Sequence, residues 1–178
     1  SASKDNTLKI WDTDSGTELR TLIGHTQSVK AVAITPDGKR AISASWPNTL
    51  KIWDTGSGRE LRTLIGHIGF VVTSVAITPD GKRAIFASWD DTLKVWDIDS
   101  GRELRTLTGH TDSVTAVAIA PDGLIVISAS SDRTLKIWDT DNGRELRTLT
   151  GHTGSVTSVA FAPDGKRAIS ASLDKTLK

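Results

Sequence analysis

The chain has 178 residues, in which 22 basic and 21 acidic side chains leave a formal net charge of +1 at pH 7. That balance argues against nucleic-acid binding, which needs an excess of Lys and Arg on one face, and the absence of cysteine excludes disulfides, zinc–thiolate sites and thiol nucleophiles. No apolar run approaches the roughly 20 residues of a membrane-spanning helix, so we expect a soluble, cytoplasmic protein without membrane partners.

The sequence repeats itself with a period of 42 or 43 residues. A Trp-Asp dipeptide recurs at this interval, and a Gly-His dipeptide keeps the same spacing. A fixed period of this length indicates repeated supersecondary units, each of which buries its apolar faces only by stacking on its neighbours. The recurring tryptophans are Trp11, Trp53, Trp96 and Trp138, and the recurring histidines are His25, His67, His110 and His152.

Strands are predicted along the whole chain, in groups set by the period, and together they form a single domain. In chain order these are two strands in residues 1–22, three complete four-stranded units in residues 23–65, 66–108 and 109–150, and two strands in residues 151–178. The opening nine residues match the closing nine, so the strands at the two ends together supply one further unit. Since the chain does not begin with Met, we expect a processed product or a part of a larger protein.

The unit at residues 109–150 shows the pattern of one repeat. Segments rich in β-branched residues or alternating in polarity occupy 114–119, 124–130, 134–139 and 144–149. Turn sequences such as Pro-Asp-Gly and Asp-Asn-Gly separate them. No segment has the 3.6-residue apolar period of a helix. We therefore predict an all-β chain in which each unit is a four-stranded antiparallel meander.

Three separated motifs recur together in register, namely Gly-His, Ser-Ala-Ser-x-Asp and Leu-Lys-Ile-Trp-Asp. With this spacing the chain resembles the WD-repeat β-propeller family over essentially its whole length. The resemblance implies four-stranded blades packed radially about a channel, with the first strand of each blade innermost. The high similarity between the repeats resembles bacterial WD-repeat arrays, which often end larger signalling proteins.

Four repeats leave the number of blades in a closed ring open. Small residues on the predicted inner strands, such as Ala31, Ala76 and Ala116, suit closely packed sheets and therefore more than four blades. We predict an eight-bladed ring made by two chains, in which the end strands of one chain complete a blade with those of the other as a velcro closure. The alternatives are a four-bladed monomer and a fragment of a longer array.

Each repeat also carries a His, a Ser, an Asp and a Trp at fixed offsets. Ser, His and Asp together suggest a nucleophilic triad, but a catalytic site is needed once and this set recurs. The family resemblance implies a structural network in which Asp holds His, His meets Ser, and Ser meets the Trp N–H. The predicted sets are His25, Ser45 and Trp53; His67, Ser88, Asp90 and Trp96; His110, Ser130, Asp132 and Trp138; and His152, Ser172 and Asp174 with Trp11.

Two details of these sets stay open. Ser128 is an alternative to Ser130, because residues two apart on a strand face the same way. In the first set Pro47 replaces the carboxylate expected to hold His25. We therefore expect a locally weaker blade, in which Asn48 or water satisfies His25.

Two tryptophans, Trp46 and Trp89, lie outside the period, each directly before the position of the turn Asp, which is Pro47 in the first case and Asp90 in the second. The family resemblance places this turn on the same face as the loops between blades. The extra residue of the 43-residue repeat falls in such a loop, beside Ile68 and Phe70. We predict that Trp46, Trp89, Phe70 and Ile68 form an apolar partner-binding face. The alternative is that both indoles fold over Pro47 and the loop as extra packing.

The sequence thus predicts a non-enzymatic scaffold that binds a protein or peptide and forms a homodimer. The alternative function is a lectin-like or small-ligand-binding propeller with repeated sites between blades. No unique acid, nucleophile or metal-ligand cluster stands out, so we expect no catalytic residue, no cofactor and no metal site.

Overall fold

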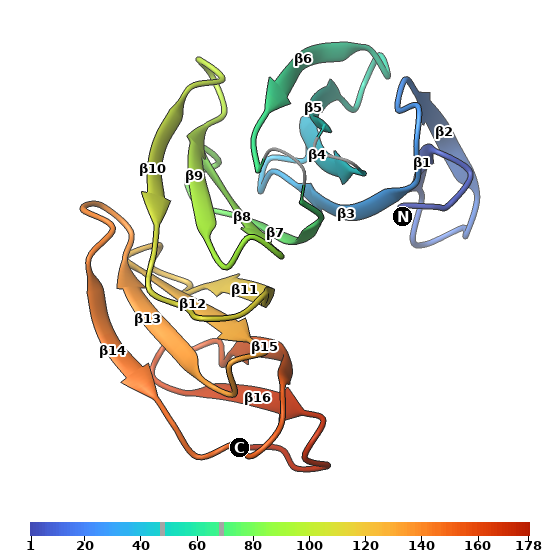
Figure 1. The fold of residues 1–178 in the computed structure, drawn as a ribbon. Helices are drawn as coiled ribbons and strands as arrows, with labels where there is room; N and C mark the ends of the chain where they lie inside the picture. Colours follow the sequence, from blue (N-terminus) through green and yellow to red (C-terminus); the bar gives the residue numbers. More distant parts are fainter. Residues whose placement is uncertain (47–48, 68–69) are drawn as a thin grey trace.

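A computed structural model describes residues 1–46, 49–67 and 70–178. These ranges hold only strands, turns and loops, and no helix in them is long and apolar enough to cross a membrane. Figure 1 shows the strands gathered into a curved row of sheets. The strands are β1 (Thr7–Trp11), β2 (Glu18–Ile23), β3 (Val29–Ile34), β4 (Arg40–Ser45), β5 (Thr49–Asp54), β6 (Glu60–Ile65), β7 (Val72–Ile77), β8 (Arg83–Ser88), β9 (Leu93–Asp97), β10 (Glu103–Leu107), β11 (Val114–Ile119), β12 (Ile125–Ser130), β13 (Leu135–Asp139), β14 (Glu145–Leu149), β15 (Val156–Phe161) and β16 (Ala168–Ser172).

The row consists of three four-stranded sheets between two two-stranded ones. Strands β3 to β6, β7 to β10 and β11 to β14 each form an antiparallel meander in chain order, and we call these the first, second and third blades. The half-sheets at the two ends are β1–β2 and β15–β16. The predicted all-β fold with four-stranded antiparallel blades is therefore confirmed.

Burial within a blade depends on the position of the strand. The second strands β4, β8 and β12 are buried along almost their whole length, because neighbouring sheets cover both of their faces. The fourth strands β6, β10 and β14 are mostly exposed and form the outer rim. A buried strand must carry apolar or paired polar side chains on both faces, which is why these second strands read as runs of Ala, Ile and Ser.

Successive blades are held together by apolar side chains between the sheets. Ile42 and Leu50 of the first blade and Phe86 of the second have no exposed surface and belong to one buried cluster. Fully burying such a side chain contributes about 1.5–3 kcal/mol. Two further clusters lie between the next sheets along the row, and a fourth lies at the N-terminal half-sheet. The cores that stabilise this chain therefore lie mainly between blades, as in other repeat proteins.

Polar contacts also join neighbouring blades. On the inner strands, Thr73 donates through Oγ1 to the carbonyl oxygen of Val114, 2.7 Å away in the next blade. At the rim, the side chain of Arg105 in β10 lies against the turn at Gly143 in the third blade. Gly143 has a φ of +74°, and a Cβ there would lie 2.8 Å from Leu107 and 2.9 Å from Arg105. Both the backbone conformation and this close approach require glycine.

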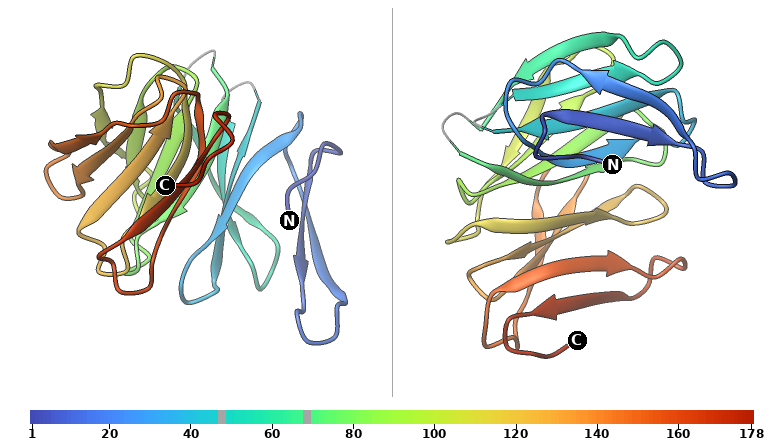
Figure 2. Two further views of the ribbon diagram at one scale, coloured as in Figure 1. Left: turned by 90° about the horizontal axis from the view of Figure 1, so that it is seen from below. Right: turned by 90° about the vertical axis from the view of Figure 1, so that its right-hand side faces the viewer.

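The row of blades stays open, and its two half-sheets lie at opposite ends of the arc (Figures 1 and 2). Each half-sheet is extended by its own chain end. The Lys9 amide donates to the Ser1 carbonyl at 2.9 Å, and the Lys178 amide donates to the Ser170 carbonyl at 3.0 Å. The four-bladed monomer considered from the sequence is not formed, because β1–β2 and β15–β16 remain separate sheets.

Candidate functional site

The third blade contains a complete polar set. His110 binds Asp132 Oδ2 through Nδ1 at 2.7 Å and Ser128 Oγ through Nε2 at 2.8 Å. The Trp138 indole donates to the same Ser128 Oγ at 2.8 Å. Since a carboxylate only accepts, Nδ1 carries the proton and Nε2 accepts from the hydroxyl, so the bonds run from Trp to Ser to His to Asp. Every polar group in the set has a partner, which is the condition for such a buried network to stabilise.

The burial of the set fixes its charge state. Removal from water lowers the pKa of His110 below its usual value, although the hydrogen bond and charge of Asp132 act the other way. Burial alone would raise the pKa of Asp132, but hydrogen bonds from Thr134 and His110 bring it below its ordinary value. At neutral pH the set therefore consists of a neutral imidazole held by a carboxylate.

In the first and third blades and in the C-terminal half-sheet, the histidine meets the serine two residues before the one predicted, which for the third blade is the alternative Ser128. In the third blade His110 meets Ser128, whereas Ser130 donates to the backbone carbonyl of Asp112 at 2.8 Å. Both serines face the same way, but Ser130 ends β12 at the level of the loop backbone and only Ser128 lies deep enough to meet the ring. The other predicted serines, Ser45, Ser88 and Ser172, are not the histidine partners either; Ser45 and Ser172 bind loop carbonyls and Ser88 accepts from an amide in its own turn.

The set of the first blade lacks its acid. His25 binds Ser43 Oγ through Nε2 at 2.7 Å, and the Trp53 indole donates to Ser43 at 2.8 Å. His25 Nδ1 is buried and has no partner among the described residues. Positions 47–48, on which the sequence placed a replacement partner, lie outside the described residues. Burial, assisted by the charge of Lys51, lowers the pKa of His25 to about 4, so the ring is neutral at pH 7.

The set of the second blade lacks its hydroxyl, a difference from the predicted set. Phe86 stands at the position of Ser43 and Ser128 and is fully buried. His67 still binds Asp90 through Nδ1 at 2.7 Å. Its Nε2 and the Trp96 Nε1, however, are buried without a partner in the described structure. The signal was present in the sequence, because this repeat reads Phe-Ala-Ser where the others read Ser-Ala-Ser.

The fourth set is divided between the two ends of the arc. His152 binds Asp174 at 2.8 Å and Ser170 at 2.9 Å in the C-terminal half-sheet. Trp11, which the sequence assigned to this set, instead donates to Ser1 Oγ at 3.0 Å in the N-terminal half-sheet. Trp11 is 45% exposed there, although its equivalents Trp53 and Trp138 are almost fully buried.

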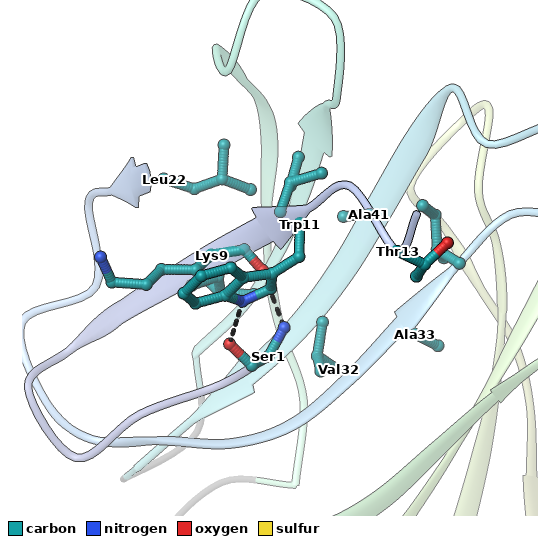
Figure 3. A pocket seen from close by; sticks show the side chains of 11 residues that line it. Ser1, Lys9, Trp11, Thr13, Leu22, Val32, Ala33 and Ala41 are labelled. Carbon is teal, nitrogen blue, oxygen red and sulfur yellow. Dashed lines mark hydrogen bonds between the residues drawn. The ribbon is translucent and has the colours of Figure 1, made fainter. Parts of the chain in front are cut away.

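A hollow beside Trp11 follows from this missing cover. It has a volume of about 380 Å³, and Leu8, Trp11, Leu22 and Val32 are among the side chains that line it. Figure 3 shows the Trp11 indole at this hollow, joined to Ser1. A complete blade would bury these side chains against a first and a second strand, which the half-sheet does not have.

Three aromatic side chains are half exposed on the face that carries the loops between blades. Trp46 is 49%, Phe70 49% and Trp89 53% exposed. The Trp89 amide donates to the Val71 carbonyl at 3.0 Å, which fixes Trp89 beside the loop that holds Phe70. Ile68, the fourth predicted member, lies outside the described residues. We call Trp46, Phe70 and Trp89 the aromatic patch.

The repeat lets us infer where Trp46 lies relative to this loop. In the third blade Ser131 occupies the position of Trp46 and Trp89, and Ser155 occupies that of Val71 in the following unit. The Ser155 hydroxyl donates to Ser131 Oγ at 3.0 Å. By equivalence of positions we infer that Trp46 lies opposite Val71, so that the two tryptophans flank one loop. Large aromatic side chains are usually mostly buried, and a cluster left half exposed is typical of interaction surfaces.

The opposite face has repeated hollows between the Pro-Asp-Gly turns of neighbouring blades. One of about 300 Å³ lies beside the ion pair of Arg40 and Asp99, whose side-chain atoms are 2.5 Å apart. The equivalent hollow in the next junction lies beside Arg83 and Asp141, 2.8 Å apart. Ile125 replaces the arginine in the third blade, so the series ends there.

Comparisons with known proteins agree with the repeats. A family profile described as "WD domain, G-beta repeat" matches residues 16–54, 58–97, 101–139 and 143–178. Ribosome assembly protein 4 from Chaetomium thermophilum is 62% identical over 37 residues, or 21% of this chain and 7% of that protein. Nuclear distribution protein PAC1 is 54% identical over 43 residues in Arthroderma benhamiae and 46% identical over 41 residues in Mycosarcoma maydis. These two matches cover 24% and 23% of this chain and 9% of each relative.

Each match is about one repeat long, so the chain matches less than a tenth of the length of these relatives. The aligned segment is a single repeat, and the rest of each relative lies outside the alignment. All three relatives are fungal. The resemblance to bacterial arrays that the regular repeats predicted therefore finds no support here.

Proposed function

The chain belongs to the WD-repeat family, and on that premise we propose that it is a non-enzymatic interaction module whose aromatic patch binds a protein or peptide. The observation that carries this proposal is the exposure of three large aromatic side chains on one loop face. Tryptophan offers a large, rigid contact area and is enriched among the residues that dominate binding energies. A partner that covers Trp46, Phe70 and Trp89 would bury this area in one step.

The interior of the blades supports a non-catalytic function. Ser128 has the neighbours of a nucleophile, with His110 and then Asp132 behind it. However, Ser128 has no exposed surface, and its oxygen already accepts the Trp138 indole N–H. A substrate carbonyl would have to approach that oxygen to within about 3 Å, for which the blade leaves no path. The hydroxyl therefore serves as a structural link.

The proposal is tested by replacing both patch tryptophans, Trp46→Ser with Trp89→Ser. Peptides are first selected on the unmodified chain from a random display library. Loss of a tryptophan at the centre of an interface costs about 2 kcal/mol or more, which is roughly 30-fold in affinity. The matched control replaces two equally exposed leucines of the outer strands, Leu104→Ser with Leu146→Ser, which lie away from the patch.

We expect the selected peptides to lose their affinity for the tryptophan variant and to keep it for the leucine control. Urea unfolding of both variants should stay within about 0.5 kcal/mol of the unmodified chain, as for most surface substitutions. Strong destabilisation by the tryptophan changes alone would favour local packing over binding. Unchanged peptide affinity would place the binding surface elsewhere.

We further propose that the open ends are covered by a second copy, so that two chains make an eight-bladed ring. The ends are complementary: Trp11 and Ser1 lack a histidine, and His152 with its partners lacks an indole. The apolar hollow beside Trp11 matches the need of a half-sheet for a neighbouring first and second strand. Light scattering tests this. A mass of twice 19.1 kDa at micromolar concentration supports the ring, and a mass of 19.1 kDa rules it out.

The repeated hollows favour a second candidate function, the binding of a small polar ligand between blades. Their lining by Arg40, Asp99, Arg83 and Asp141 offers charged hydrogen-bonding groups. Calorimetric stoichiometry separates the two candidates, because hollows at successive junctions bind two equal ligands per chain and the aromatic patch binds one. The cytoplasmic location stays a prediction from the sequence.

A further inference from the structure

Acidic side chains border the aromatic patch at its Trp89 end. Asp91 follows Trp89 in the same turn and is partly buried, and Asp112 is exposed in the loop that leads into the third blade. Neither carboxylate forms an ion pair with a cation of the described residues. The Asp112 carboxylate accepts only the amide of Ser113, at 2.7 Å.

The equivalence of the repeats lets us infer that Asp112 lies next to Trp89. Ser131 is the residue before the turn Asp of the third blade, and Ser155 is the residue before β15, the inner strand of the next sheet. These two side chains are in contact. In the preceding junction these positions are Trp89 and Ser113, and Asp112 lies directly before Ser113. From this equivalence we infer that Trp89 has Val71 on one side, to which its amide donates, and Asp112 on the other. Asp112 is also close enough to Asp91 for its charge to act on that carboxylate, so we treat the apolar surface and the carboxylates as one strip.

The negative charge at this end of the strip is not compensated. Burial raises the pKa of Asp91, and the nearby charges of Asp112, Asp90 and Asp132 raise it further. Asp90 is hydrogen-bonded to His67 and Asp132 to His110, and no Lys or Arg of the described residues pairs with either carboxylate. Arg133 and Lys175 stand at the positions equivalent to Asp91 in the two following turns, and neither forms an ion pair with Asp91 or Asp112 among the described residues. A partner cation at Trp89 would therefore relieve repulsion that the folded chain leaves in place.

We propose that the aromatic patch binds a peptide segment with a Lys or Arg side chain beside an apolar one, the cation lying between Asp91, Asp112 and the Trp89 ring. The aliphatic stem of such a side chain packs on an indole while its charged end meets the carboxylates. The apolar neighbour covers Phe70 and Trp46. This inference rests on the proposed function of the patch and adds the chemistry of its partner.

Random linear peptides are selected from a display library for binding to the unmodified chain at low salt. The double tryptophan variant, Trp46→Ser with Trp89→Ser, identifies the peptides that need the patch. These peptides are then measured on Asp91→Asn with Asp112→Asn. Asn is tolerated at position 91 with its φ of +66°, since Asn6 holds the equivalent position with a φ of +72°. The charge-matched control is Asp14→Asn with Asp122→Asn, two exposed carboxylates in turns at the opposite face.

We expect the patch-dependent peptides to be enriched in Lys or Arg. Exposed ion pairs contribute modestly, so loss of both carboxylates should weaken binding by roughly three- to thirty-fold, and the control pair should leave it unchanged. Raising the salt concentration should remove most of the difference between the unmodified chain and the Asn variant.

Two outcomes overturn the inference. Patch-dependent peptides that are neutral or acidic, or that bind the Asn variant as well as the unmodified chain, refute the cationic partner and leave the proposed function intact. A selection that yields no patch-dependent peptide refutes both the proposed function and the partner assigned to it.

Discussion

Replacing Ser128 by Ala tests whether the buried polar set of the third blade is a connected network. The substitution removes one oxygen and leaves almost no cavity, so the effect comes from hydrogen bonding. Two partners lose their bonds, His110 Nε2 and Trp138 Nε1, each 2.8 Å from the serine oxygen. Both partners are buried in the blade.

The expected cost follows from those two groups. A buried donor or acceptor left without a partner costs about 1–3 kcal/mol of stability. Part of this cost is offset, because the alanine variant no longer has to bury a polar hydroxyl. We expect Ser128→Ala to lower the free energy of unfolding by about 2–4 kcal/mol, measured by urea unfolding followed by circular dichroism. In a Trp138→Phe background no indole N–H remains to be orphaned, so the cost of Ser128→Ala should be about 1 kcal/mol smaller.

Ser130→Ala is the matched control, since Ser130 donates to the Asp112 carbonyl and accepts from the Asp132 amide but touches neither His110 nor Trp138. At a typical value of about 1 kcal/mol or less per hydrogen bond, its loss should cost about 1–2 kcal/mol, which is less than the loss of Ser128. Equal costs for Ser128→Ala and Ser130→Ala, or a cost of Ser128→Ala under about 0.5 kcal/mol, would refute the network.

Three further predictions concern pH, a turn and local stability. The pKa of His25 falls from 6.5 to about 4 on folding, so the unfolded chain binds a proton at a higher pH than the folded chain does. The free energy of unfolding, measured in urea titrations, should therefore be full above pH 6.5 and decline towards pH 4. His25→Gln should reduce this decline. Gly143→Ala should destabilise by about 2–3 kcal/mol in thermal unfolding, and Gly16→Ala, with a similar φ but open space around it, by about 1 kcal/mol. Amides near Ser43 and Trp53 should exchange faster than those near Ser128 and Trp138, because His25 Nδ1 lacks the partner that His110 has; equal protection would contradict a weaker first blade.

Strand positions and the grouping into blades followed from the sequence, because a repeat tests each local pattern several times. The Asp–His and Ser–Trp pairings also followed, but from the family resemblance. The choice between Ser128 and Ser130 could not be predicted, because side chains two residues apart on a strand lie on the same face. Only the depth of the histidine ring in the blade decides which serine it meets. The serine that recurs in every repeat is the one that binds the loop, and Phe86 interrupts the series of the other.

Exposure was the second quantity that the sequence left undecided. Trp46 and Trp89 could equally have folded over their own loops, because no periodic pattern governs an irregular loop. Their inferred position on both sides of the Phe70–Val71 loop rests on the contact between Ser131 and Ser155, which only the structure supplies. The inferred proximity of Asp112 to Trp89 rests on the same contact, which joins two blades and therefore residues far apart in the sequence.

The indole N–H resonances test the central claim, that the aromatic patch is the binding surface, most directly. The chain has six tryptophans, so a ¹⁵N spectrum assigned by substitution follows each one during titration with a selected peptide. We predict that Trp46 and Trp89 shift with the binding isotherm, while Trp53 and Trp138, which are sealed between blades, do not. Saturated binding that leaves Trp46 and Trp89 unshifted, or that shifts only Trp11, would contradict the claim.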